Sequence, residues 1–99
     1  MIDDDKRRLV YARAGRLCEV CHVARPLHGP WGIRGEVAHR VANTKWCRER
    51  YGEDMLDHVD NLAWTCPGRC NDAVLITFKP VARERLMTDI ATKLAQGEG

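Results

Sequence analysis

Four of the five cysteines fall into two closely spaced pairs, an arrangement typical of zinc sites. Cys18 and Cys21 are separated by two residues, and Cys66 and Cys70 are separated by three, which include a Pro-Gly turn. Zinc prefers four thiolate or imidazole ligands in a tetrahedron, and each short turn places two sulfurs on one side of such a site. The spacing therefore predicts one structural zinc ion bound by all four thiolates. The two pairs lie far apart in the chain, so this ion would clamp the segment between them.

Other interpretations of the cysteines are weaker. Ordinary buried thiols and disulfides are the alternatives, and an odd number of cysteines cannot all pair. His22 directly follows Cys21 and could replace a ligand, but a surface position is the simpler interpretation. Cys47, beside Trp46, is interpreted as a small packing residue.

The composition predicts one folded domain in a reducing compartment. The chain has 99 residues, of which 44% are hydrophobic and 30% are charged, so it is not expected to be disordered. The N-terminus is charged where a signal peptide would be apolar, and no apolar run approaches the roughly 20 residues of a membrane span. We therefore expect a cytoplasmic location and no membrane partner, while nothing indicates monomer or dimer. The net charge of +2 does not by itself indicate nucleic acid.

The segments that must position the cysteines follow from the pattern of apolar residues. Three aspartates precede a predicted helix over about residues 4–16, since acidic side chains favour a helix N-terminus. Glycines and prolines predict a loop over 23–35. Alternation predicts a strand over 36–42, and a second strand is expected over 61–65. The polar segment between these strands, 43–60, is expected to be extended, with a helical turn as the alternative, and to be the most mobile part of the core.

Helices are expected to complete the chain after the second cysteine pair. One should run from about Cys70 to Phe78, and Pro80 can begin a final helix. Apolar residues at every fourth position make one stripe on that helix, which we expect to pack on the domain rather than form a dimer interface: Ala82, Leu86, Ile90 and Leu94. The three tryptophans are expected to pack in the core: Trp31, Trp46 and Trp64. The prediction is a small α+β domain over 1–99, with an N-terminal helix (1–17), a zinc-stapled core (18–78) and a C-terminal helix (79–99).

The order of the motifs around the cysteines resembles the HNH endonucleases. The pieces CEVC, EVAHRV, DNLAWTC and CPGRCND span about residues 18–78. The resemblance implies a ββα-metal core in which His39 is the general base that activates water. It implies that Asn61 fixes the two strands and orients that histidine. Asn71 stands where the last histidine of the motif would bind a catalytic ion such as Mg²⁺ or Mn²⁺, which would make this chain an H-N-N variant.

The sequence departs from the family at the residue before the general base. Many family members have a metal-binding side chain there, whereas this chain has Ala38. Phosphodiester hydrolysis needs a deprotonated water and a divalent metal, so another ligand would be required. Its candidates are Glu36, Asp57, His58, Asp60 and Asp72. His58 and His28 are otherwise expected to be solvated loop residues, and His39 could alternatively be a core histidine.

The resemblance implies a metal-dependent DNA endonuclease or nickase, with DNA as the partner and phage or mobile-element origin. Six basic residues lie near the predicted site in sequence: Arg34, Arg40, Lys45, Arg48, Arg50 and Arg69. Of these, Arg40, Lys45 and Arg69 are the predicted phosphate contacts, with a solvated face as the alternative. A second hypothesis is an inactive HNH-like zinc module that binds nucleic acid or a protein. A third, a structural zinc-knuckle protein, does not account for His39 and Asn61.

Overall fold

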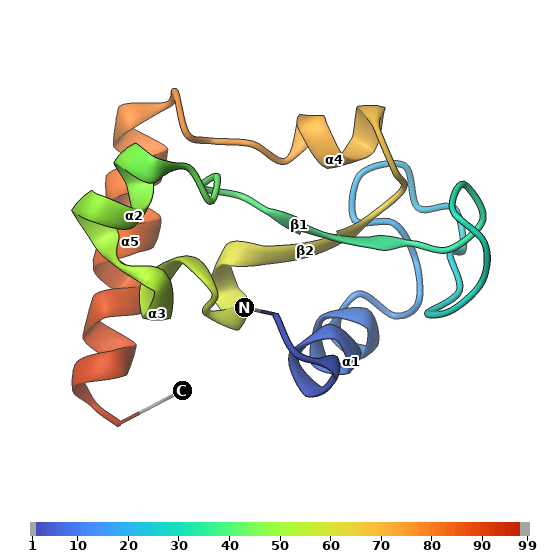
Figure 1. The fold of residues 1–99 in the computed structure, drawn as a ribbon, viewed down its shortest axis with the longest axis horizontal. Coiled ribbons are helices and arrows are strands. Elements are labelled where there is room, and N and C mark those ends of the chain that lie inside the picture. The colour runs from blue at the N-terminus through green and yellow to red at the C-terminus, as the bar shows by residue number, and fades with distance from the viewer. Residues whose placement is uncertain (1, 98–99) are drawn as a thin grey trace.

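A two-stranded antiparallel sheet forms the centre of the computed structural model, which describes residues 2–97. Strand β1 (Glu36–His39) pairs with β2 (Leu62–Thr65) in a register that sets Glu36 opposite Thr65 and His39 opposite Leu62. Figure 1 shows helix α1 on one side of the sheet and α4 on the other, with α2, α3 and α5 gathered beyond one end. The protein is therefore a small α+β domain, as the sequence predicts.

Both strands are shorter than expected. Strand β1 already ends at His39, and β2 begins only at Leu62. Neighbouring residues of a strand point to opposite faces. Val37 packs with Leu62 and Trp64 in a cluster that includes Val10 of α1. His39 shares this face with Val37, whereas Glu36 and Ala38 point to the opposite face.

Helix α1 (Asp4–Arg13) begins where its acidic N-terminus predicts and ends earlier than residue 16. The Asp3 side chain caps it by accepting a hydrogen bond from the Lys6 backbone N–H at 2.8 Å. Gly15 and Arg16 both have positive φ, near 65° and 69°, so the helix cannot continue through them. The chain then turns directly into the first cysteine pair.

The expectation of an extended segment over residues 43–60 is wrong. This segment forms helix α2 (Lys45–Tyr51), helix α3 (Glu53–Leu56) and a single 3₁₀ turn, η1 (Val59–Asn61). Thr44 caps α2 by accepting a hydrogen bond from the Cys47 N–H at 3.2 Å. Gly52, with φ of 86°, makes the bend between the two helices. The polar composition concealed a few apolar residues at helical spacing, and these pack against α5.

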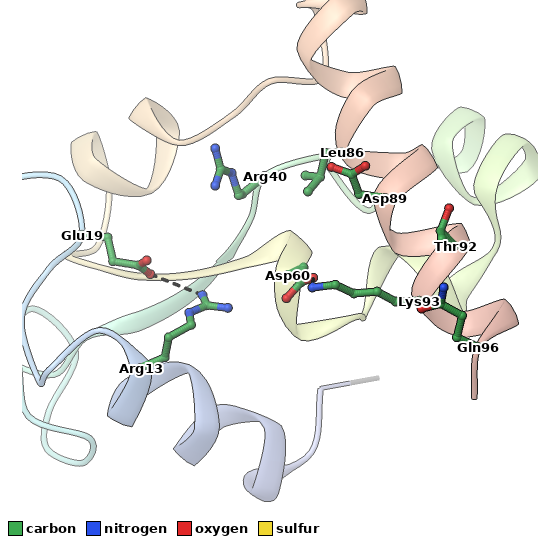
Figure 2. A pocket seen from close by; sticks show the side chains of 9 residues that line it. All are labelled: Arg13, Glu19, Arg40, Asp60, Leu86, Asp89, Thr92, Lys93 and Gln96. Atoms are coloured by element: carbon green, nitrogen blue, oxygen red, sulfur yellow. Dashed lines mark hydrogen bonds and ion pairs between the residues drawn. The ribbon is translucent and has the colours of Figure 1, made fainter. Parts of the chain in front are cut away.

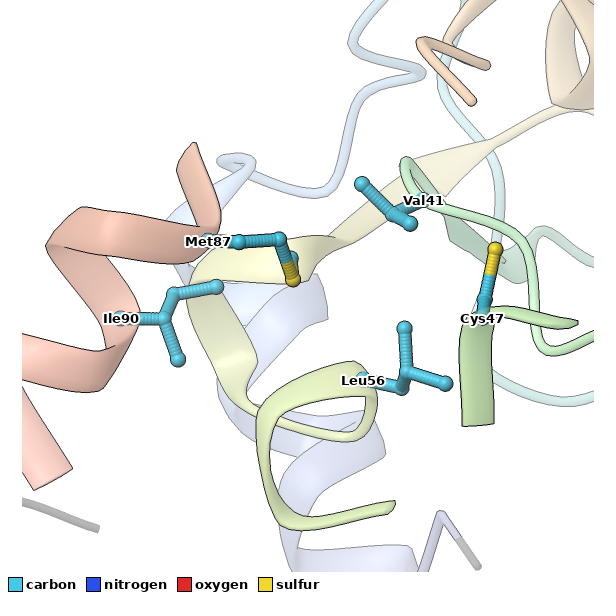
Figure 3. Packing of buried hydrophobic residues seen from close by; sticks show 5 residues of the cluster. All are labelled: Val41, Cys47, Leu56, Met87 and Ile90. Carbon is cyan, nitrogen blue, oxygen red and sulfur yellow. The ribbon is translucent and has the colours of Figure 1, made fainter. Parts of the chain in front are cut away.

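Helix α5 (Pro80–Ala95) packs on the domain through its apolar stripe, as predicted. Pro80 occupies its first turn. Figure 3 shows the fully or nearly fully buried cluster that joins α5 to α2, α3 and the end of β1: Val41, Cys47, Leu56, Met87 and Ile90. Leu86 and Leu94 are partly buried against the same cluster. Cys47 is thus the packing residue that the sequence suggested.

Only one of the three tryptophans lies in the core. Trp64 is fully buried, but Trp31 is 72% exposed and Trp46 is 52% exposed, so the packing prediction is wrong for these two. Trp64 requires a glycine beside it, because a Cβ on Gly35 would lie 2.3 Å from Trp64 Cε2. Trp46 lies on the surface under the guanidinium groups of Arg50 and Arg83. Helix α4 (Arg69–Ala73) is also shorter than the predicted 70–78 helix.

We expect Leu56→Ala to destabilise the protein far more than Leu9→Ala. Leu56 is fully buried between α3 and α5, whereas Leu9 is 60% exposed on α1. Removing a buried leucine side chain typically costs about 2–5 kcal/mol, and an exposed one about 0.5 kcal/mol or less. Urea unfolding followed by circular dichroism measures both. Equal losses for the two variants would contradict the proposed packing of residues 43–60.

Candidate metal centre and histidine site

Four thiols from two distant segments meet at one end of the sheet. Cys18 and Cys21 follow α1, Cys66 follows β2, and Cys70 lies in α4. Their Sγ atoms all lie within 4.8 Å of one another, and Cys21 Sγ is 3.5 Å from Cys66 Sγ. A tetrahedral ion with bonds of about 2.3 Å to sulfur would hold its ligands about 3.8 Å apart, so the cluster matches that size. These four residues can therefore hold a metal ion, and all are free thiols.

Hydrogen bonds to the sulfurs make the cluster suitable for thiolates. Burial alone would raise the pKa of the Cys18 thiol, but N–H groups of Cys21, Cys66 and Val20 lower it to about 6. Two of these backbone donors, on Val20 and Cys66, lie 3.4 Å from Cys18 Sγ. Burial raises the pKa of the Cys66 and Cys70 thiols, the latter to about 12, in the absence of a metal ion. A bound cation would reverse that penalty, since a coordinating thiol is deprotonated.

Arg25 connects this cluster to the loop that precedes β1. Its Nε donates to Cys66 Sγ at 3.1 Å. Its Nη1 donates to the carbonyl oxygens of Gly32 and Ile33, at 2.6 and 3.2 Å. Partners of this kind around a metal ligand orient it and offset its negative charge. Nothing in the sequence pattern indicates this role, because Arg25 is one of sixteen basic residues and lies far from Cys66 in the chain.

Asn61 holds the opposite end of the sheet together. It is fully buried, and its Oδ1 accepts from the Val41 N–H at 2.8 Å. Its Nδ2 donates to the carbonyl oxygens of Val41 at 3.1 Å and Leu56 at 2.8 Å. One side-chain amide thus satisfies three backbone groups from two separate turns. Asn61 therefore has a structural role at the end of the sheet where His39 lies.

His39 ends β1 and is paired with a carboxylate. Its Nε2 lies 3.0 Å from Asp57 Oδ1, and its side chain is 21% exposed. Burial alone would raise the pKa of Asp57, yet the hydrogen bond from His39 and nearby positive charge hold it below its ordinary value. Asp57 therefore stays ionised here, and the stability it contributes is lost only as pH falls through its lowered pKa. An ionised carboxylate cannot donate, so Nε2 carries the proton of this hydrogen bond, and in the neutral imidazole Nδ1 is then the acceptor nitrogen.

Asn71 lies away from His39. Asn71 Nδ2 donates to Glu36 Oε2 at 3.1 Å, on the face of the sheet that α4 covers. His39 lies on the other face and three residues further along β1, a separation of about 10 Å along the strand. Ala38 shares the face of Glu36 and is buried. Among residues 2–97, the four cysteines are the only cluster of three or more His, Cys, Asp or Glu side chains arranged to hold a metal ion.

The three predicted phosphate contacts lie on three different elements. Lys45 is on α2, Arg69 is the first residue of α4, and Arg40 directly follows β1. Figure 2 shows Arg40 beside a surface depression of about 660 Å³ between the sheet, α1 and α5. The depression carries charges of both signs and is lined by Arg13, Glu19, Arg40, Asp60, Leu86, Asp89, Thr92, Lys93 and Gln96. Of the predicted phosphate contacts, only Arg40 therefore lines this depression.

The remaining histidines differ in burial. His22 and His28 are exposed, as the sequence suggests. The expectation of a solvated His58 is wrong, because it is 3% exposed and its Nδ1 accepts from the Asp60 N–H at 3.1 Å. Its Nε2 is buried and has no hydrogen-bond partner in the described part of the chain. The turn of η1 buries His58, and a polar sequence around it gave no indication of this.

Comparison with protein-family models, curated proteins and solved structures finds no match to this chain. The described helices include none with the length and apolar character to cross a membrane. The site must therefore be interpreted from its own geometry.

We expect purified protein to contain about one zinc ion per chain, measured by elemental analysis. Chelation should unfold the domain, because ligand-induced folding supplies much of the stability of such sites. Cys66→Ser should lose most of the metal and melt earlier. Cys47→Ala is the matched control for metal content, since Cys47 is buried in the hydrophobic cluster and is not one of the four clustered cysteines. Full zinc content and unchanged melting in Cys66→Ser would contradict the four-cysteine site.

Proposed function

We propose that this chain is a small HNH-type endonuclease or nickase with a ββα-metal core, which hydrolyses phosphodiester bonds in DNA. The observation that carries the proposal is the pair of His39 and Asp57, 3.0 Å apart at the end of β1. Asn61, buried beside it, supports the same interpretation through its three backbone hydrogen bonds. The four-cysteine cluster, with zinc as its proposed ion, supports it at the other end of the sheet.

His39 would act as the general base. Asp57 accepts the hydrogen bond from Nε2, so Nδ1 can accept a proton from water. The resulting hydroxide attacks phosphorus and the bond from phosphorus to the leaving oxygen breaks. That oxygen takes a proton from a solvent water, and His39 returns its own proton to solvent. A divalent ion such as Mg²⁺ or Mn²⁺ would stabilise the negative charge on the phosphate. A zinc ion with four cysteine ligands has no open position and cannot serve this purpose.

Asn71 and Glu36 are the proposed ligands of that divalent ion. Their side chains are 3.1 Å apart, and amide and carboxylate oxygens suit hard cations. They lie about 10 Å from His39 along β1 and on the opposite face, so this pair would have to approach His39 on binding DNA for the ion to act on the phosphate that is attacked. Arg40, Lys45 and Arg69 are retained as proposed phosphate contacts.

The second candidate is a non-catalytic zinc module with an HNH-like core that binds nucleic acid or a protein. Two observations favour it: Ala38 offers no ligand, and the described residues contain no second metal cluster. The separation of His39 from Asn71 is consistent with the same conclusion. Catalysis in the presence of divalent ions distinguishes the two candidates.

We expect His39→Ala to reduce metal-dependent DNA cleavage by about 10²–10⁴-fold, as is typical when a general base is removed. Zinc content should stay unchanged, and the melting temperature should fall less than in Cys66→Ser, because only the hydrogen bond to Asp57 is lost. His28→Ala is the matched control, since His28 is an exposed loop residue. A plasmid-nicking assay with Mg²⁺ or Mn²⁺ measures the rates. If the wild type cleaves no DNA with any divalent ion, the proposed nuclease activity is rejected. If His39→Ala cleaves as fast as the wild type, His39 is not the general base.

We expect Asn71→Asp to bind Mn²⁺ at least as tightly as the wild type, because the change adds a negative charge beside Glu36. Asn71→Ala should bind it more weakly, since one oxygen ligand is lost. Titration of Mn²⁺ followed by electron paramagnetic resonance, on protein with its cysteine site filled, measures both. Identical Mn²⁺ affinity in the two variants would remove Asn71 from the site.

A further inference from the structure

Trp31 is the most exposed tryptophan of the protein, and it is nevertheless held in a defined position. Its side chain is 72% exposed. Its indole Nε1 donates to Glu36 Oε1 at 3.1 Å, which fixes the ring relative to β1. A large aromatic surface that is both exposed and oriented is unusual, because exposure forgoes the stabilisation of burial.

The turn that carries Trp31 is anchored at both of its ends. The N–H groups of Ile33 and Arg34 both donate to the Pro30 carbonyl, at 3.1 and 3.2 Å. The Arg25 guanidinium binds the carbonyls of Gly32 and Ile33 and is itself fixed by Cys66 Sγ. The metal centre therefore supports the turn, and a ligand that meets Trp31 would meet a preorganised surface.

The position of Trp31 links it to the proposed catalytic region. Glu36 accepts from Trp31 with one carboxylate oxygen and from Asn71 with the other. Trp31 is thus connected through Glu36 to Asn71 of α4. Arg34 and Arg69 are exposed in the same two segments, and neither guanidinium has a hydrogen bond or ion pair within residues 2–97. Two positive charges thus lie in the two segments that Glu36 joins, the turn of Trp31 and the start of α4.

An exposed aromatic ring with exposed arginines in its own turn and in the neighbouring helix is suited to single-stranded nucleic acid. Every base offers a flat face for stacking, and arginines can contact the adjacent phosphates. A hydrophobic protein partner would instead favour a broad apolar patch, whereas only Ile33 accompanies Trp31 as a large exposed apolar side chain in this turn. We infer that Trp31 stacks against an unpaired nucleobase of a single-stranded DNA segment, with Arg34 and Arg69 at its phosphates. The inference takes nucleic acid as the partner from the proposed function, and it adds the strand type and the contact residue.

The test measures binding of a fluorescein-labelled 12-nucleotide oligothymidylate to the zinc-loaded chain, by fluorescence anisotropy without added Mg²⁺ or Mn²⁺. Stacking on one aromatic residue changes affinity by about 5- to 100-fold on truncation to alanine. Trp31→Ala should lose this amount, and Trp31→Phe should retain most of the affinity. Trp46→Ala is the matched control, because Trp46 is also exposed but lies on α2. Melting temperatures verify that each variant is folded, and Trp46→Phe replaces the control if Trp46→Ala unfolds.

An oligomer of abasic sites tests whether the contact is to a base. It should bind the wild type more weakly than oligothymidylate does, and Trp31→Ala should not distinguish the two. Equal affinity of the wild type and folded Trp31→Ala for oligothymidylate overturns the inference, as does wild-type binding to duplex but not to single strands. If the wild type cleaves DNA while Trp31→Ala binds normally, only this inference fails. If Trp31→Ala loses single-strand binding but the wild type cleaves nothing, only the proposed nuclease fails.

Discussion

The side-chain amide of Asn61 is the interaction on which the arrangement of this small protein depends most. It is fully buried, and it satisfies the N–H and carbonyl of Val41 and the carbonyl of Leu56. Leaving a buried backbone group unpaired costs about 1–3 kcal/mol, so three such groups exceed what a marginally stable domain tolerates easily. The amide hydrogen-bonds both ends of the connection between the strands, near Val41 and near Leu56. Leu56 packs in the hydrophobic cluster with α5, and His39 lies at the end of β1.

The cysteine cluster performs the same task at the other end of the sheet. A domain of this size has a limited core, and here the core is divided into two clusters, one on each side of the strand ends. Bringing residues 18–21 to residues 66–70 joins the N-terminal segment to α4. Arg25 binds both Cys66 Sγ and the Gly32 carbonyl, so it connects the cysteine cluster to the exposed turn that carries Trp31.

The pleat of β1 gives the proposed nuclease its main geometric constraint. Because successive side chains alternate between faces, His39 and Glu36 cannot point the same way. The histidine consequently pairs with Asp57 on the α1 side, while the Glu36–Asn71 pair lies under α4. The two pairs therefore cannot share one ion in the arrangement that the structure shows.

The sequence by itself determined the features that depend on residue type and local spacing. The cysteine pairs, the acidic start of α1, the stripe on α5 and the positions of two short strands all follow from such local rules. The zinc ion and the nuclease activity stay predictions, since neither the fold nor a comparison tests them. Residues 43–60 were misjudged because their few apolar side chains become meaningful only against α5.

Only the tertiary structure decided which side chains meet. Asp57 and His39 are distant in sequence, as are Arg25 and Cys66, and neither pairing has a local signature. The burial of His58 and the exposure of Trp31 run against residue type, so composition could not predict them. The physical reason is common to all four cases: local spacing fixes the direction of a side chain along its own element, whereas its neighbours depend on how separate elements pack.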